Sequence, residues 1–202
     1  MAAALAAAEQ KNHQVVLLER QARLGRKLSA TGNGRCNLTN LHAMEGGYHG
    51  ENPDFIRPAM ESFSVENTLS WFEKLGLYTV AEPSGRVYPY SDQANSVVDV
   101  LRFSLEQENI QVRTGFEVEK IRKIPEGFSV SSQQETLIFD RLIIACGGLA
   151  GTRLGGGMFG YRFLRGFGHH CTRLIPPWCR LKLTGRGFRP SRESGPTAMR
   201  PF

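Results

Sequence analysis

The sequence predicts an α/β fold with a parallel sheet, and three observations carry that prediction. Residues 1–10 are nearly all Ala and Leu, which are among the strongest helix formers. Residues 14–19 (QVVLLE) follow as a short apolar run with β-branched residues, which is typical of a strand buried in a parallel sheet. A further helical segment at 92–108 leads into residues 110–114, which we expect to be a strand.

A loop and a further helix are predicted between the first strand and the helical segment at 92–108. Residues 24–50 are rich in Gly, Asn, Thr and Arg and should form a long structured loop, whereas residues 54–75 return to helical spacing. The apolar residues of this helix that we expect in the core are Phe55, Ile56, Phe63, Leu69, Trp71, Phe72 and Leu75. In the helix at 92–108, a shared apolar face is predicted for Val97, Val98, Leu101 and Leu105, with Ser91 or Asp92 as N-cap.

Strand patterns dominate after residue 110. Residues 117–123 and 128–132 are predicted to form a hairpin, because Pro125-Glu126-Gly127 between them is a turn signal. Residues 137–146 are predicted to form one further strand that runs directly into Gly147-Gly148. Periodicity weakens beyond residue 151, and the Pro-, Gly- and Arg-rich residues 185–202 are predicted to be disordered.

The formal net charge of +6 is unevenly distributed along the 202 residues. Residues 1–150 hold 15 Lys and Arg against 18 Asp and Glu, whereas residues 151–202 hold 10 basic residues and one acid, Glu193. A nucleic-acid binder that uses this basic tail is therefore one alternative, although no recognition motif accompanies the charge and we rank it last. Its phosphate contacts would come from Arg165, Arg173, Arg180, Arg186, Arg189 and Arg192.

The cysteines and the hydropathy limit the remaining classes. Cys36, Cys146, Cys171 and Cys179 show no CxxC spacing and no zinc-like spacing to histidines, so no metal site is predicted. No stretch approaches the ~18 apolar residues that a membrane span needs. The sequence therefore predicts a cytoplasmic protein with ordinary thiols and no membrane or nucleic-acid partner.

Glu19, the acid that ends the first apolar strand, suggests a dinucleotide site. In a Rossmann βαβ unit the G-x-G-x-x-G loop lies between the first strand and the helix, and an acid ~20 residues later binds the ribose. The glycines should lie ~20 residues before Glu19, which is just upstream of Met1. Met1 therefore stands where an internal residue of the following helix is expected. We therefore expect a first strand and a glycine loop upstream of Met1, so that this chain is a fragment and retains FAD weakly.

The glycine-rich loop contains the most specific motif. Its parts are LGRKL at 24–28 and TGNGRCNLTN at 31–40. Its glycines let the backbone approach a ligand closely, and Arg26, Lys27 and Arg35 can neutralise a diphosphate. Asn33 and Asn37 supply donors and acceptors for a polar ring edge or a ribityl chain.

These motifs resemble a known family, the NAD(P)/FAD-dependent oxidoreductases of the BaiN and YhiN kind, also called the aminoacetone oxidase family. The similar stretches are MAAALAAAEQKNHQVVLLE, LGRKLSATGNGRCNLTN, GRVYPYSDQANSVVDVL and RLIIACGGLAG, and the resemblance spans residues 1–182. It implies an FAD fold of the glutathione-reductase type, in which a Rossmann-like domain is interrupted by a second domain.

The resemblance also implies roles for individual residues. Glu19 would hold the AMP ribose, Arg26 and Lys27 would lie beside the diphosphate, and the backbone of Val118, in the hairpin after Gly115, would meet the adenine edge. The loop along the flavin would comprise Gly32, Asn33, Gly34, Arg35, Cys36 and Asn37. Ala145-Cys146-Gly147-Gly148 would be a strand end passing the cofactor, with Cys146 a small buried residue rather than a redox nucleophile. Tyr88 and Tyr90 are open candidates for facing the flavin or the substrate, and no catalytic residue is assigned.

The chain departs from this family at both ends. The glycine loop is absent, and the stretch 155–161 (GGGMFGY) has Phe159 where the family has an acid. We predict a partial FAD-binding domain at 1–154, the start of the interrupting domain at 155–184 and a tail at 185–202 that is typical of a shifted reading frame. The implied function is FAD-dependent oxidation or reduction of a small organic substrate, with NAD(P)H as candidate co-substrate. The alternative is a non-catalytic fragment without cofactor.

Overall fold

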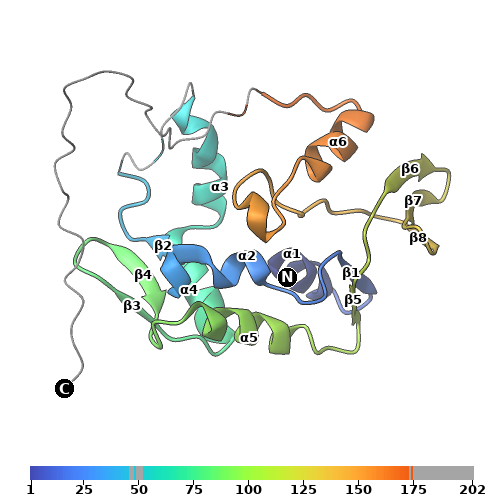
Figure 1. Cartoon of the computed structure of the whole chain (residues 1–202). Helices are drawn as coiled ribbons and strands as arrows, with labels where there is room; N and C mark the ends of the chain where they lie inside the picture. The colour runs from blue at the N-terminus through green and yellow to red at the C-terminus, as the bar shows by residue number, and fades with distance from the viewer. Residues whose placement is uncertain (46–47, 49–51, 173, 175–202) are drawn as a thin grey trace, which may run out of the picture. The chain divides into compact units, whose positions relative to one another are not determined.

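The computed structural model describes residues 1–45, 48, 52–172 and 174 (Figure 1). The chain divides into two compact units, Met1–His169 and His170–Phe202, and all helices and strands of the described residues lie in the first unit. The predicted tail at 185–202 lies outside the described residues.

A parallel pair of strands confirms the predicted α/β class. Helix α1 (Ala2–Ala8) precedes strand β1 (Val15–Glu19), which pairs in parallel with β5 (Ile110–Thr114). The register aligns Val15 with Ile110 and Glu19 with Thr114. Both strands therefore end at the same edge of the sheet, where the polypeptide turns away from it.

Helix α5 (Ala94–Ser104) supplies the centre of the core through the face that its sequence predicts. The side chains of Val97, Val98, Leu101 and Leu105 are all buried. Val97, Leu101 and Leu105 belong to a core cluster that also includes Ala4 and Leu5 of α1. The predicted N-cap is wrong: Gln93 holds this position without a side-chain bond. Asp92 cannot serve because its backbone is left-handed, with φ of 55°, and its carboxylate binds Arg35.

The predicted helix at 54–75 is three elements rather than one. These are η2 (Pro53–Ile56), α3 (Arg57–Ser62) and α4 (Val65–Lys74). The Ser64 hydroxyl accepts a bond from the Asn67 amide at 3.2 Å and so begins a new helix with its own phase. Because of that break, Phe55 and Phe63 are 83% and 49% exposed, and their assignment to the core is wrong. Trp71, within α4, packs against the core as predicted.

A small antiparallel sheet joins the glycine-rich loop to residues 79–89, and none of its strands is predicted from the sequence. It orders β2 (Thr39–Asn40), β4 (Arg86–Pro89) and β3 (Thr79–Ala81), with β4 in the middle. Val87 of β4 is almost completely buried, and its carbonyl accepts a bond from the Leu38 amide at 2.8 Å. This sheet anchors the far end of the loop that carries the TGNGRCN motif.

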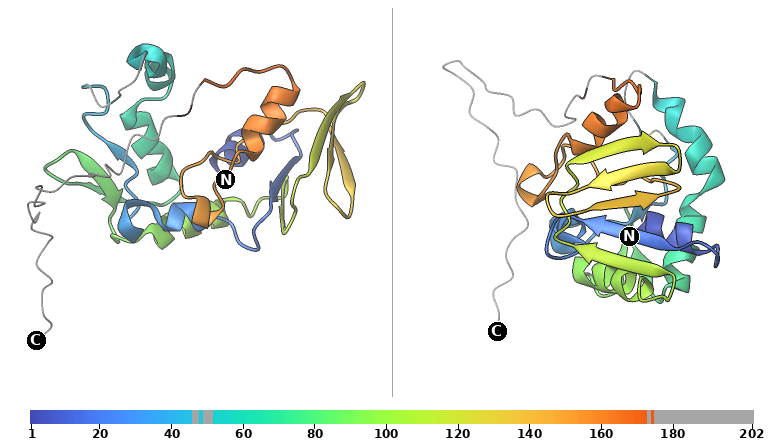
Figure 2. Two further views of the ribbon diagram at one scale, coloured as in Figure 1. Left: turned by 45° about the horizontal axis from the view of Figure 1, so that its top comes forward. Right: turned by 90° about the vertical axis from the view of Figure 1, so that its right-hand side faces the viewer.

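The predicted hairpin is present as part of a three-stranded antiparallel meander, visible in Figure 2. Its strands are β6 (Lys120–Ile124), β7 (Gly127–Ser131) and β8 (Thr136–Phe139). The single strand predicted at 137–146 is wrong beyond Phe139. Its first residues pair with β7, whereas residues 140–147 join no ladder among the described residues, and Ile143 is 62% exposed.

The last elements of the first unit are η3 (Thr152–Leu154) and α6 (Phe159–Gly166). Gly160 of α6 packs so closely on Cys146 that a Cβ there would lie 2.8 Å from the sulfur. The compact unit therefore continues past residue 154, where the sequence predicts a domain boundary. Within the described residues, no helix is long and apolar enough to cross a membrane.

Candidate functional site

The carboxyl edge of the β1–β5 pair brings Glu19 and the segment after β5 together. The Glu19 carboxylate accepts a bond from the Gln21 amide at 2.8 Å through Oε1. The Phe116 amide donates to the Glu19 carbonyl at 2.9 Å, and the Gly115 amide donates to the Gln21 carbonyl at 3.0 Å. Ligands of open parallel sheets bind outside the carboxyl ends of the strands, so this edge is the first part of the candidate site.

Val118 lies two residues beyond this junction. It precedes β6 in an extended segment rather than in the hairpin, which corrects the predicted bounds of that strand. Within the described part of the chain, its amide and carbonyl form no hydrogen bond with protein atoms. A free donor and acceptor on one peptide segment match the edge of a purine ring, as the resemblance implies.

The two adjacent basic residues of the short helix α2 (Arg26–Ser29) diverge. Arg26 donates from Nη1 to the Gln21 side-chain oxygen at 3.0 Å, so it lies over the end of β1. The Lys27 ammonium lies against another segment, because a Cβ on Gly147 would be 3.2 Å from Nζ. Gly25, which begins the helix, has φ of 82°. One basic residue thus reaches the strand end and the other the ACGG segment.

A run of left-handed residues shapes the next part of the loop, which includes η1 (Thr31–Gly34). The φ values of Gly32, Asn33, Gly34 and Cys36 are 55°, 55°, 87° and 61°. A Cβ on Gly32 would lie 2.8 Å from the Asn37 amide nitrogen, so only glycine fits this close approach. Residues 31–34 are exposed, and they present their backbone to the solvent side of the loop.

The Arg35 side chain contacts two carboxylates and an aromatic ring, whereas the sequence predicts that it neutralises a diphosphate. Its Nε donates to Asp92 at 2.5 Å, its Nη2 donates to Glu82 at 2.8 Å, and its guanidinium carbon lies 3.9 Å from the centre of the Tyr88 ring. The hydrogen bonds with Glu82 and then Asp92 hold the pKa of Arg35 above its ordinary value. The guanidinium expected to neutralise a diphosphate is therefore already engaged by two carboxylates.

Cys36 turns toward the protein, whereas Asn37 is exposed but hydrogen-bonded. Cys36 is buried in the core cluster, and this burial raises the pKa of its thiol, against the opposing effect of a hydrogen bond with Thr31. The amide of Asn37, oriented by its hydrogen-bond partners, donates to the Thr39 carbonyl at 2.8 Å. Contact of these two residues with a cofactor stays a prediction.

Arg20 is a residue of the site that sequence reasoning missed. It follows Glu19 directly, and its Nη2 donates to the Gly155 carbonyl at 2.6 Å, while its guanidinium carbon lies 4.5 Å from the centre of the Phe159 ring. Phe159, noted above as the replacement of an acid, thus receives a cation on its face. A basic residue immediately after the strand acid was the available signal.

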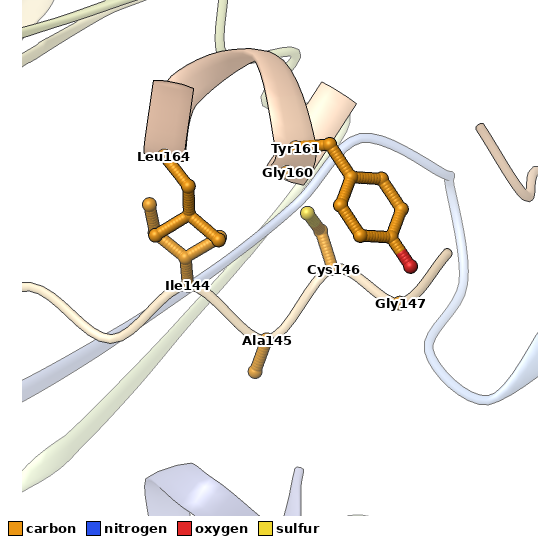
Figure 3. A pocket seen from close by; sticks show the side chains of 7 residues that line it. All are labelled: Ile144, Ala145, Cys146, Gly147, Gly160, Tyr161 and Leu164. Carbon is orange, nitrogen blue, oxygen red and sulfur yellow. The ribbon is translucent and has the colours of Figure 1, made fainter. Parts of the chain in front are cut away.

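The ACGG segment borders a cavity of about 350 Å³ (Figure 3). Its lining residues are Ile144, Ala145, Cys146, Gly147, Gly160, Tyr161 and Leu164. The Cys146 thiol points toward the α6 residues Gly160 and Tyr161, yet the residue is exposed, so its expected burial is wrong. Residues 140–147 lack a paired strand to cover them, which explains the exposure. No cluster of metal-ligating residues is found among the described residues.

The chain is similar to known proteins over most of its length. Residues 1–189 match the family model described as HI0933-like protein Rossmann domain. A 3-dehydro-bile acid delta(4,6)-reductase of Clostridium scindens is 39% identical over 93% of this chain and 46% of its own length. Ribosomal RNA dihydrouridine synthases are 32% identical in Escherichia coli and 26% identical in Haemophilus influenzae, each over 81% of this chain and 40% and 41% of their lengths.

The chain therefore spans less than half the length of the curated relatives it matches. The family match extends seven residues past the end of the resemblance noted from the sequence, and both agree on a Rossmann domain. With that match across most of its residues, the chain belongs to the HI0933-like Rossmann-domain family.

Proposed function

We propose that this chain carries part of the FAD site of a flavin-dependent oxidoreductase that reduces a small organic substrate. The observation that carries the proposal is the junction at the carboxyl edge of β1 and β5. There Glu19 and the segment leading to Val118 are tied together by two backbone hydrogen bonds, from Phe116 and Gly115. FAD would supply the redox chemistry itself by accepting and delivering a hydride.

The residues at this edge fit the adenosine half of FAD. Glu19 uses Oε1 to accept the Gln21 amide, and Oε2 has no hydrogen bond within the described part of the chain, so it is free to accept a ribose hydroxyl. The unbonded amide and carbonyl of Val118 would recognise the adenine edge.

The diphosphate of FAD would lie near Lys27. Its ammonium has no carboxylate partner among the described residues, and it lies beside Gly147, where a missing Cβ lets a ligand approach. Arg26 points instead to the end of β1, where it donates to the Gln21 side chain. A cation without an internal partner is the feature that a phosphate site requires.

The reaction class is drawn from the names of the relatives. A delta(4,6)-reductase and a dihydrouridine synthase both saturate a carbon–carbon double bond. We therefore infer that the substrate is an unsaturated carbonyl compound and that NAD(P)H supplies the hydride to the flavin. The relative with the higher identity is named for a bile acid, which favours a small molecule.

A uracil base in RNA is the second candidate substrate, favoured by the names of the two dihydrouridine synthases. The two candidates differ in a measurable way. Binding of RNA weakens steeply as salt rises, because phosphate contacts release counterions, whereas binding of an uncharged enone does not. Substrate-dependent reoxidation of reduced flavin, measured with each substrate across a salt series, separates them.

The cofactor proposal is tested by titrating the purified chain with FAD over a wide concentration range and following flavin fluorescence. Glu19→Gln should raise the Kd by a factor of about 10–100, because a charge-assisted bond contributes about 1.5–3 kcal/mol. Glu126→Gln, in the exposed β6–β7 turn, is the matched control and should leave the Kd unchanged. Equal affinities of wild type and Glu19→Gln would remove Glu19 from the site, and no binding by the wild type would favour the cofactor-free alternative.

A further inference from the structure

One side chain of the glycine-rich loop at 31–37, Arg35, contacts three distant positions of the chain. We propose that Arg35 is a positioning residue, which fixes this loop in its left-handed conformation and does not itself contact the cofactor. The inference rests on the proposed function for its meaning, since the loop is expected to lie along the flavin. Its physical content, the dependence of the loop on Arg35, can be measured without any cofactor.

Three contacts to three positions along the chain immobilise the Arg35 guanidinium. Glu82 lies in the turn between β3 and β4, Tyr88 lies within β4, and Asp92 lies in the link between β4 and α5. The two carboxylates occupy separate nitrogen atoms, Nη2 and Nε, while the aromatic ring covers one face of the plane. A planar fork with several donors is suited to such a bridge, and a single ammonium is not.

The backbone on both sides of Arg35 needs this support. Asn33 and Cys36 are non-glycine residues with φ of 55° and 61°, a conformation that costs free energy for any residue with a Cβ. Such residues persist where the surrounding structure over-determines them. The loop's own backbone bonds, from the Arg35 amide to Gly32 and from the Cys36 amide to Thr31, are both 3.1 Å and span only a few residues. Arg35 adds the contacts that reach distant parts of the chain.

The charge balance separates Arg35 from a ligand-binding cation. Its positive charge faces two carboxylates, so the cluster as a whole is not positive and offers nothing to a diphosphate. Asp92, which itself has φ of 55°, is fixed by the turn in which its amide donates to the Pro89 carbonyl at 2.8 Å. The Asp92 end of the ion pair is therefore held by its own turn, and a cofactor would have to break the pair to recruit Arg35.

Hydrogen exchange of the cofactor-free chain tests the proposal directly. Arg35→Met keeps the side-chain stem over the Tyr88 ring and removes the charge, and Asp92→Asn removes the charge while an asparagine still accepts a left-handed φ. Each should speed exchange of the backbone amides of residues 31–37, and Arg35→Met should have the larger, several-fold effect because it also removes the bond to Glu82. The double variant should exchange little faster than Arg35→Met, because that variant already lacks the Asp92 contact. Asp99→Asn is the matched control: it breaks an exposed Asp–Arg pair of α5 and should leave the loop unchanged.

Two further readouts exclude a merely global effect. Amides of α5 around Val97 and Leu101 should keep their wild-type protection in all variants. Arg35→Lys should behave like Arg35→Met, since a lysine retains the charge but cannot bridge both carboxylates while stacking on the ring. Full rescue by lysine, or wild-type exchange of the loop in Arg35→Met, would overturn the proposal.

FAD titration then distinguishes positioning from direct contact. If Arg35 positions the loop, Arg35→Met and Asp92→Asn both raise the Kd, Asp92→Asn by the smaller factor because it leaves the bond to Glu82. If Arg35 binds the cofactor directly, Asp92→Asn releases the guanidinium and leaves the Kd unchanged or lower, which would refute the inference. Should the wild-type chain bind no FAD, the proposed function fails, and the exchange experiment still decides whether Arg35 holds the loop.

Discussion

Gly25 is the residue whose substitution the structure makes easiest to quantify. It begins helix α2, from which Arg26 and Lys27 project, and it packs on Val98 of α5. A Cβ at this position would lie 2.6 Å from Val98 Cγ1 and 3.0 Å from Cγ2. Gly25→Ala should therefore destabilise the protein and displace the two basic residues together.

Two separate costs make up the expected effect. The φ of 82° places an alanine in the left-handed region, which costs about 1–2 kcal/mol. The overlap with Val98 is an overpacking of the core, which costs about 1–3 kcal/mol, because a β-branched side chain in a helix has one strongly preferred rotamer and cannot turn aside. Gly25→Ala should thus lower the free energy of unfolding by about 2–5 kcal/mol.

Urea denaturation followed by tryptophan fluorescence measures this change. Gly76→Ala is the matched control, since Gly76 has φ of 90° and nothing within 4 Å of a built Cβ, so it bears only the backbone cost. In Gly25→Ala/Val98→Ala the overlap disappears, and the double variant should be less destabilised than the sum of its parts by about 1–3 kcal/mol. Equal losses in Gly25→Ala and Gly76→Ala, or strict additivity in the double variant, would refute the reasoning.

Three further predictions concern the core, a helix cap and pH. Val97→Ala empties a fully buried position and should lower the unfolding free energy by about 2–3 kcal/mol in the same urea assay. Ser64→Ala removes the bond to the Asn67 amide and should cost about 0.5–2 kcal/mol, which Ser64→Asp should largely restore. Burial raises the pKa of the Cys36 thiol. Its contribution to stability is therefore complete below the unfolded pKa of about 8.5 and is lost as pH rises through the folded value. Cys36→Ala should lose less stability than wild type between about pH 7 and pH 10, and an identical alkaline loss would contradict the assignment.

The sequence predicted those elements whose signal is local and repeated. Strand β1 and helix α5 have continuous or periodic apolar residues, and Val97 and Leu101 lie on the buried face that the spacing indicates. The hairpin followed from one turn signal between two alternating segments. In each case the residues whose pattern predicts the element also pack against a neighbouring element, so the local pattern and the tertiary contacts favour the same structure.

The errors arose where one residue changes the phase or the partner of an element. Ser64 divides a helical pattern that otherwise continues, so Phe55 and Phe63 fall outside the core. The run at 137–146 is apolar except for Asp140 and Arg141, but a strand exists only where it finds a hydrogen-bonding neighbour, and β7 pairs with no residue beyond Phe139. Neither effect is encoded in the periodicity of the segment concerned.

The loop motif shows a different limit of sequence reading. Its specificity suggested a set of side chains aimed at a ligand, yet Arg35 faces two carboxylates, Cys36 fills the core and Asn37 bonds the Thr39 carbonyl. These three residues differ in chemistry because each one contacts a different kind of group in the protein. The loop leaves residues 31–34 and Asn37 exposed, and the side chain of Asn33 forms no hydrogen bond within the described residues. A ligand of this loop would therefore meet these residues, and replacing Asn33 by glycine, which tolerates its φ of 55°, should change ligand affinity with little loss of stability.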